Sequence, residues 1–181
     1  MPSKKMSVRE LSSIAIFAAI ITVCAQISIP MPHGVPMTLH TFAVPLAGMI
    51  LGKRNGTLAS LVYVTLGLAG VPVFAEFTGG AGIVFGVSGG FILSFPLVSF
   101  AAGIAAERKT KLMCITWLLI GLVVNFLCGM FMFCVVHSGH VMTFLIYIAL
   151  PYIPLDVLKI GLVVALSKSI KTALVKSKLL T

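Results

Sequence analysis

Charged side chains are scarce in this sequence, and acidic ones are nearly absent. Only 9% of the 181 residues are charged, and four residues in the chain are Asp or Glu. A mean hydropathy of +1.16 is too high for the water-exposed surface of a soluble domain of this size. The composition therefore predicts that a lipid bilayer is the solvent. The length allows about six crossings of roughly 20 residues each and leaves no room for a catalytic ectodomain.

The sequence also lacks the motifs of membrane enzymes and pumps. It has no His-Glu-x-x-His motif, no phosphate-binding loop and no Ser, His and Asp in an order typical of a nucleophile with its base. The four cysteines form no Cys-x-x-Cys pair, and the four histidines share no metal-ligand spacing. We therefore expect no enzyme activity, no cofactor and no metal. Any ATP hydrolysis that the function needs must come from another subunit.

The positions of the basic residues predict the membrane topology. Twelve of the thirteen lie at the two ends of the chain or at every second junction between apolar runs: Lys4, Lys5, Arg9, Lys53, Arg54, Arg108, Lys109, Lys111, Lys168, Lys171, Lys176 and Lys178. The alternate junctions contain no Lys or Arg, so the positive-inside rule places both termini in the cytoplasm. The basic residues form no patch beside aromatic side chains, so we expect contact with membrane lipid and not with nucleic acid.

Apolar runs and helix-breaking residues predict an all-α fold, an integral membrane six-helix bundle forming a single domain over residues 1–181. The expected helices cover residues 11–29, 39–51, 56–70, 91–106, 112–136 and 142–167. The second and third are short for a full span, which predicts a pocket at their outer ends. Pro30, Pro32 and Pro36 predict a non-helical outer loop or lid. Seven glycines between Gly70 and Gly90 predict irregular backbone that is packed in protein or lines a cavity.

Lys159 is the one basic residue outside the topological pattern. It precedes Lys168 by nine residues, which places it about 13 Å along the helix, near the bilayer centre. A charge there costs about 2.5–3.5 kcal/mol, so a partner is expected. Asp156 lies three residues earlier on the same helix face, and Pro151 and Pro154 loosen the backbone just before it. The pair predicts a site for a small polar or anionic ligand, and a purely structural ion pair is the alternative.

Other residues are candidates for ligand or partner contact. Glu76 lies in the glycine-rich loop, where it is either a ligand contact or a solvated carboxylate. Asn125 is an amide in an apolar helix, where it hydrogen-bonds either across helices or to a ligand. Ala15 and Ala19 form a small-xxx-small step that lets another helix approach closely.

Three stretches of the sequence carry a family resemblance. They are VPMTLHTFAVPLAGMILGKRNGTLASLVYVTLGLAGVPVF at 35–74, FTGGAGIVFGVSGGF at 77–91 and PYIPLDVLKIGLVVAL at 151–166. In order and spacing they resemble the BioY family, the biotin-specific S components of energy-coupling factor (ECF) transporters, over nearly the whole chain. The resemblance implies the S-component fold with a biotin pocket near the outer surface, covered by the loop after the first helix.

The resemblance also implies residue roles. Asp156 and Lys159 are expected to contact biotin. Asp156 accepts a ureido N–H, whereas Lys159 donates either to the ureido oxygen or to the carboxylate. The glycine-rich loop, including Gly79 and Gly80, is expected to contact the ligand, and Phe74, Phe77 or Phe91 to form the apolar wall. Family members usually read Gly-Pro-Thr-Gly-Gly where this chain has GVSGG at 86–90, and without the proline the loop is less rigid.

The implied function is the capture of biotin at the outer face of the cytoplasmic membrane and its delivery inward. In the family the alanine step, here Ala15 and Ala19, packs on a transmembrane coupling subunit that two ATP-binding subunits drive. Two other functions stay open. One is an S component for another vitamin, such as thiamine or riboflavin. The other is a proton-coupled carrier that uses Asp156 and Lys159 as a relay.

Overall fold

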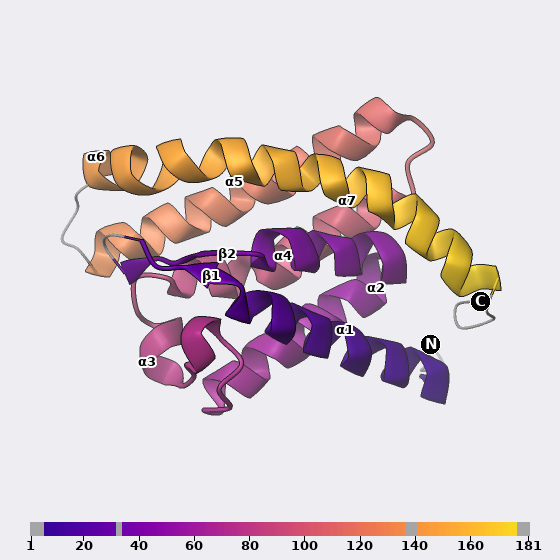
Figure 1. The fold of residues 1–181 in the computed structure, drawn as a ribbon, viewed down its shortest axis with the longest axis horizontal. Coiled ribbons are helices and arrows are strands. Elements are labelled where there is room, and N and C mark those ends of the chain that lie inside the picture. Colours follow the sequence, from indigo (N-terminus) through magenta and orange to yellow (C-terminus); the bar gives the residue numbers. More distant parts are fainter. Residues whose placement is uncertain (1–5, 32–33, 137–140, 177–181) are drawn as a thin grey trace, which may run out of the picture.

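A computed structural model describes residues 6–31, 34–136 and 141–176, which form a layered helical bundle (Figure 1). Short irregular elements join the long helices. In chain order the elements are α1 (Val8–Gln26), β1 (Ser28–Ile29), β2 (Met37–Thr38), α2 (His40–Leu68), the 3-10 turn η2 (Ala75–Phe77), α3 (Ala81–Val84), α4 (Gly89–Ala106), α5 (Lys111–Val136), α6 (Val141–Phe144), the π turn η3 (Leu145–Ala149) and α7 (Leu150–Lys176).

Four helical stretches in the described part of the chain are long and apolar enough to cross a membrane. They are α1, α4, α5 and the continuous run Val141–Ala173, which joins α6, η3 and α7. Their outward faces carry many exposed aliphatic side chains, such as Leu127 and Leu158. Such surface suits lipid and not water, so the prediction of a helical integral membrane protein is confirmed.

The second and third predicted helices are the two halves of α2, which turns back on itself at Gly52. Gly52 has a φ of 79°, a conformation that glycine adopts easily and that interrupts the helix. A Cβ on Gly56 would lie 2.6 Å from the Cα of Gly48. In an unbroken helix these residues would be about 12 Å apart along the axis. The polar residues Lys53, Arg54 and Asn55 at the break lower the hydropathy of α2, so it does not form one apolar span.

The two halves of α2 pack closely on α4 because glycines lie at the crossing. A Cβ on Gly103 of α4 would lie 2.2 Å from the Cα of Lys53, and one on Gly48 would lie 2.1 Å from the carbonyl oxygen of Ser99. Backbone therefore contacts backbone, and Val44, Ala47 and other small residues complete the core there.

The connection after α1 differs from the prediction. The first helix was expected to continue to residue 29 but ends at Gln26, and Ser28 and Ile29 form β1 instead. β1 pairs antiparallel with β2, with Ser28 opposite Thr38 and Ile29 opposite Met37. The proline-rich stretch is thus anchored as a two-stranded ribbon, so the fold is not purely helical. The 70–90 stretch is irregular as predicted, apart from the short η2 and α3.

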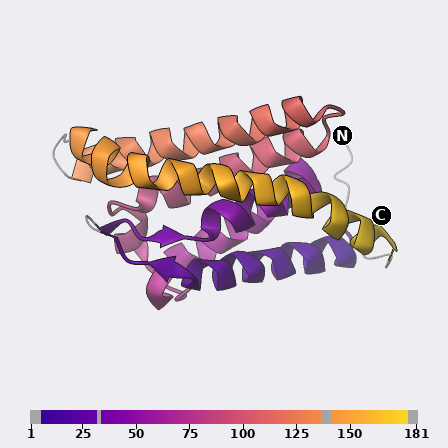
Figure 2. The same cartoon turned by 45° about the horizontal axis from the view of Figure 1, so that its top comes forward.

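The two ends of the bundle are built differently. Figures 1 and 2 show that α1 begins and α7 ends at the same end of the molecule, whereas β1, β2 and α3 lie toward the opposite end. At that opposite end the last helical run contains the π turn η3, followed by Pro151 and Pro154. Proline cannot donate a backbone hydrogen bond, and π turns recur at functional sites. Irregular backbone from the β1–β2 ribbon, the 70–90 stretch and the start of the last helical run therefore gathers at one end.

Candidate functional site

A cavity of about 320 Å³ lies among these irregular segments. Its wall is formed by the β1–β2 ribbon, the start of α2, residues 74–76 with Thr78, the first turns of α4, the middle of α5 and the start of α7. Most of the lining is apolar, with aromatic rings from Phe74, Phe91 and Phe95. A mostly apolar cavity of this size with a few placed polar groups is typical of a small-molecule site.

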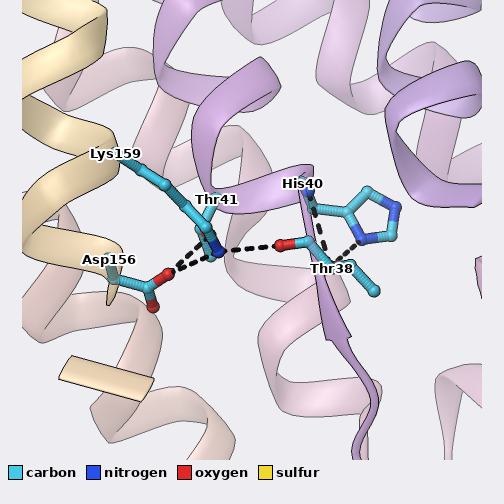
Figure 3. A network of polar contacts seen from close by, with 5 residues as sticks. All are labelled: Thr38, His40, Thr41, Asp156 and Lys159. Carbon is cyan, nitrogen blue, oxygen red and sulfur yellow. Dashed lines mark hydrogen bonds and ion pairs between the residues drawn. The ribbon is translucent and has the colours of Figure 1, made fainter. Parts of the chain in front are cut away.

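Lys159 and Asp156 form the centre of a polar cluster on this wall (Figure 3). Their side chains are 12% and 4% exposed, and Lys159 Nζ lies 2.9 Å from Asp156 Oδ1. Figure 3 shows the lysine reaching from α7 toward the start of α2. There Nζ donates to Thr38 O at 2.8 Å and to Thr41 Oγ1 at 2.9 Å, while Thr41 Oγ1 donates to Asp156 Oδ1 at 2.7 Å. The cluster joins the last helix to the ribbon and to α2.

The cluster has one unused acceptor. A lysine ammonium has three N–H donors, and here Thr38, Thr41 and Asp156 accept all three. Asp156 Oδ1 accepts twice, whereas Oδ2 has no hydrogen-bond partner among the described residues. Lys159 therefore neutralises and orients the carboxylate, and the open acceptor for a ligand belongs to Asp156.

His40 and Tyr152 add two further polar side chains to the wall. The His40 ring contacts Thr38 Oγ1 at 2.8 Å through Nδ1, and its Nε2 is hydrogen-bonded to the buried Tyr63 hydroxyl. The Tyr152 hydroxyl donates to Val35 O. His40 is held at both ring nitrogens and Tyr152 at its hydroxyl, so hydrogen bonds fix this part of the wall.

Asn125 lies on the same wall, 2% exposed, and its Oδ1 accepts a hydrogen bond from Ser94 Oγ at 2.7 Å. The bond joins α5 to α4, which is the helix-packing role that the sequence left open. The Asn125 amide nitrogen has no hydrogen-bond partner among the described residues. A donor at the cavity wall is therefore available to a ligand oxygen.

Gln26 fixes the loop that brings Glu76 to the cavity. Its Nε2 donates to Val73 O at 3.3 Å and to Phe74 O at 3.0 Å, while its Oε1 accepts from Phe77 N at 2.9 Å. Glu76 and Phe77 have φ angles of 57° and 55°, which side-chain-bearing residues adopt rarely. The glutamine therefore holds a strained turn in place from the end of α1.

The structure brings together most, but not all, of the residues that the sequence predicts for the site. Asp156, Lys159, Asn125, Glu76, Phe74 and Phe91 line the cavity. Among the described residues the lining does not include Phe77, Gly79 or Gly80. The Phe77 ring is 72% exposed, and a Cβ on Gly79 would lie 2.4 Å from Val71 O. The two glycines shape the loop, and Phe77 does not belong to the wall.

Sequence reasoning missed Thr38, Thr41, His40 and Tyr152. Thr38 and Thr41 are three residues apart and flank residue 39, where a helix was expected to begin. This spacing was the one sequence signal that could have indicated them. Ala15 and Ala19 are exposed on α1, away from the cavity. Within the described ranges, no three His, Cys, Asp or Glu side chains gather as a metal site would require. His137 and His140 lie outside the described residues.

A buried polar cluster on the wall of an apolar cavity, within a bundle of apolar helices, defines an integral membrane protein with a small-molecule site. Comparison with known proteins identifies the family. The model of the BioY family matches residues 1–176. A protein of Pyrococcus horikoshii named "Probable biotin transporter BioY" is 37% identical over 92% of this chain and 98% of its own length. The chain belongs to the BioY family.

Two further comparisons agree with this membership. The "Biotin transporter BioY" of Thermotoga maritima is 48% identical over 56% of this chain and 59% of its own. The crystal structure of the S-component for biotin from an ECF-type ABC transporter superposes with a TM-score of 0.82, covers 95% of both chains and is 24% identical. The chain thus has the S-component fold that the sequence predicts.

Proposed function

We propose that this chain is the substrate-binding S component of an ECF importer and that biotin occupies the cavity. The observation that carries the proposal is the Lys159, Asp156 and Thr41 cluster on the wall of a largely apolar cavity of about 320 Å³. A buried ion pair of this kind is costly, and its position beside an otherwise apolar space supports a role in recognition. In this function the chain binds and releases its substrate without a catalytic step, a cofactor or a metal.

The wall offers one hydrogen-bond acceptor and one donor, which match the N–H and C=O groups of a ureido ring. The open Oδ2 of Asp156 accepts a ureido N–H, and the free amide of Asn125 donates to the ureido oxygen. Lys159 acts through Asp156, because its own donors are already used within the protein. The thioether ring then lies against Phe74, Phe91 and Phe95, which are apolar and line the same space.

We infer six crossings, with the halves of α2 supplying two of them and both termini in the cytoplasm. The support is that the basic residues of the α4–α5 turn lie beside Lys168 and Lys171 of α7, and that α1 begins at the end where α7 ends (Figures 1 and 2). In this orientation the cavity lies toward the outer face of the cell membrane, and the β1–β2 ribbon and the 74–78 segment cover it. Biotin would enter and be retained from that side.

We further propose that a transmembrane coupling subunit contacts the exposed Ala15 and Ala19 face of α1. Side chains of one carbon leave the helix backbone accessible, so a second helix can approach closely. Two ATP-binding subunits would supply the energy, since this sequence has no phosphate-binding loop.

Equilibrium binding of radiolabelled biotin to the purified chain in detergent tests the proposal. We expect Asp156→Asn and Lys159→Ala to weaken binding at least tenfold, and Glu107→Gln, at the exposed pair with Lys53, to have no effect. Biotin methyl ester should compete with the label, whereas biotin substituted at a ureido nitrogen should not. Unchanged binding in both cavity variants would remove the site. Better competition by thiamine or riboflavin would reassign the substrate.

A further inference from the structure

A second, smaller cavity of about 110 Å³ lies far from the proposed biotin site. It is formed by the turn between α4 and α5 and by the last turns of α7. In Figures 1 and 2, α5 and α7 separate toward this end of the bundle, where α7 ends. The floor is small and apolar, with Met49, Ala105 and Cys114 all buried.

Five cations surround this cavity, which we call the basic pocket: Arg108, Lys109, Lys111, Lys168 and Lys171. In the described part of the chain no carboxylate lies within 4.0 Å of any of them. The neighbouring Glu107 is paired with Lys53, at 3.3 Å. Five like charges around one hollow repel each other, so the pocket favours an anion that the described residues do not supply.

The cations of the basic pocket converge on one hollow, which the ordinary enrichment of basic residues at cytoplasmic helix ends does not require. Lys168 and Lys171 are three residues apart on α7 and so share a face, which turns toward the cations of the α4–α5 turn. The Arg108 guanidinium lies over the Trp117 ring, 5.5 Å from its centroid, which orients it. Ser167 and Thr110 add hydroxyl groups to the lining. A positive-inside signal needs charge near the membrane surface but not convergence on a hollow.

We propose that the basic pocket binds the phosphate of an anionic phospholipid headgroup. The cations lie where the apolar stretches of α5 and α7 end, which is the depth of lipid headgroups. Exposed apolar side chains continue from the pocket along both helices, with Leu112 and Met113 on α5 and Leu162 and Leu166 on α7. They offer an acyl chain a surface that a free phosphate would not use. Basic pockets between membrane helices are known to take such headgroups.

Native mass spectrometry of the full chain in detergent, titrated with dimyristoylphosphatidylglycerol, tests this proposal. We expect the first lipid to bind at least tenfold tighter than dimyristoylphosphatidylcholine. Each neutralised cation should weaken binding about fivefold, so Lys168→Gln with Lys171→Gln should weaken it about 25-fold. The matched control is Arg54→Gln with Lys176→Gln, which removes two exposed charges at the same end but outside the lining. It should change the affinity less than twofold.

Three results would overturn the proposal. Equal losses in the two double variants would show that net charge and not the pocket attracts the lipid. Equal affinity for the two lipids would exclude charge recognition. Full displacement by inorganic phosphate or glycerol 3-phosphate at the concentration of the lipid would assign the pocket to a soluble anion. A thermal unfolding temperature within a few degrees of the parent confirms that each variant is folded.

Discussion

The two ends of the bundle differ in whether the cations that line their cavities are, among the described residues, buried and paired or exposed and unpaired with a carboxylate. At the cavity end a single cation, Lys159, is largely buried and has all its donors bonded within the protein. At the other end the five cations of the basic pocket are exposed and have no carboxylate within reach among the described residues. A buried charge must be satisfied by the fold and so becomes part of its structure. An exposed one stays free to bind from outside.

The strongest test of this contrast is the removal of one member of the buried pair. Asp156→Ala should lower the free energy of unfolding by about 3–5 kcal/mol, because Lys159 then lacks its counter-ion. The exposed pair of Lys53 and Glu107, both about half-exposed, should contribute no more than about 1 kcal/mol. Unfolding curves of Asp156→Ala and Glu107→Gln in detergent give the comparison.

The double variant Asp156→Ala with Lys159→Met separates stability from recognition. Removing both charges should restore most of the stability that Asp156→Ala loses, since no uncompensated charge remains. Biotin binding should stay lost. Recovered binding in the double variant would show that the pair is structural and not part of the site.

The next test concerns packing, because α2 and α4 meet at the basic end through close backbone contact. Gly103→Ala should cost about 1–3 kcal/mol, since its Cβ would lie 2.2 Å from the Cα of Lys53. Gly161→Ala on α7 is the matched control, because nothing lies within 4 Å of its Cβ, and it should be neutral or slightly stabilising. Equal unfolding temperatures for the two variants would contradict the close crossing.

The difference between local and long-range interactions explains which features could be predicted from the sequence. Hydropathy, proline and glycine placed most helix ends to within about three residues, and the predicted gap between residues 51 and 56 contains the break at Gly52, because each signal is local. The last helix was predicted to end at residue 167 but continues to Lys176, because its final turns are basic and not apolar. The depth of Lys159 and the i, i+3 spacing identified its pair with Asp156 for the same reason. Thr38 and Thr41 could not be assigned, since they meet Lys159 only after 118 or more residues of chain have folded. The β1–β2 ribbon depends likewise on a pairing that periodicity does not encode.

Substitution of Gln26 tests whether biotin retention at the cavity end depends on side-chain hydrogen bonds to irregular backbone. Gln26→Leu removes three hydrogen bonds to the 73–77 segment while keeping a side chain of similar size. We expect biotin to bind about two- to tenfold more weakly, chiefly through faster dissociation, as for a net loss of about 0.5–1.5 kcal/mol. Stopped-flow dissociation of a fluorescent biotin measures it, and Gln26→Glu, which retains the acceptor, should be intermediate. Unchanged dissociation would show that the turn holds without its anchor.

The smallest effect is expected at Phe77, which separates the wall of the cavity from the loop beside it. The ring is 72% exposed and outside the lining, whereas Phe74 is 1% exposed and packs edge-on against Tyr63. Phe77→Ala retains the backbone N–H that Gln26 holds, so stability should change by less than about 0.5 kcal/mol. Biotin affinity should stay within twofold. Phe74→Ala serves as the positive control, at about 3–5 kcal/mol. A large loss of affinity in Phe77→Ala would mean that the ring folds over the bound ligand and that the wall is completed only on binding.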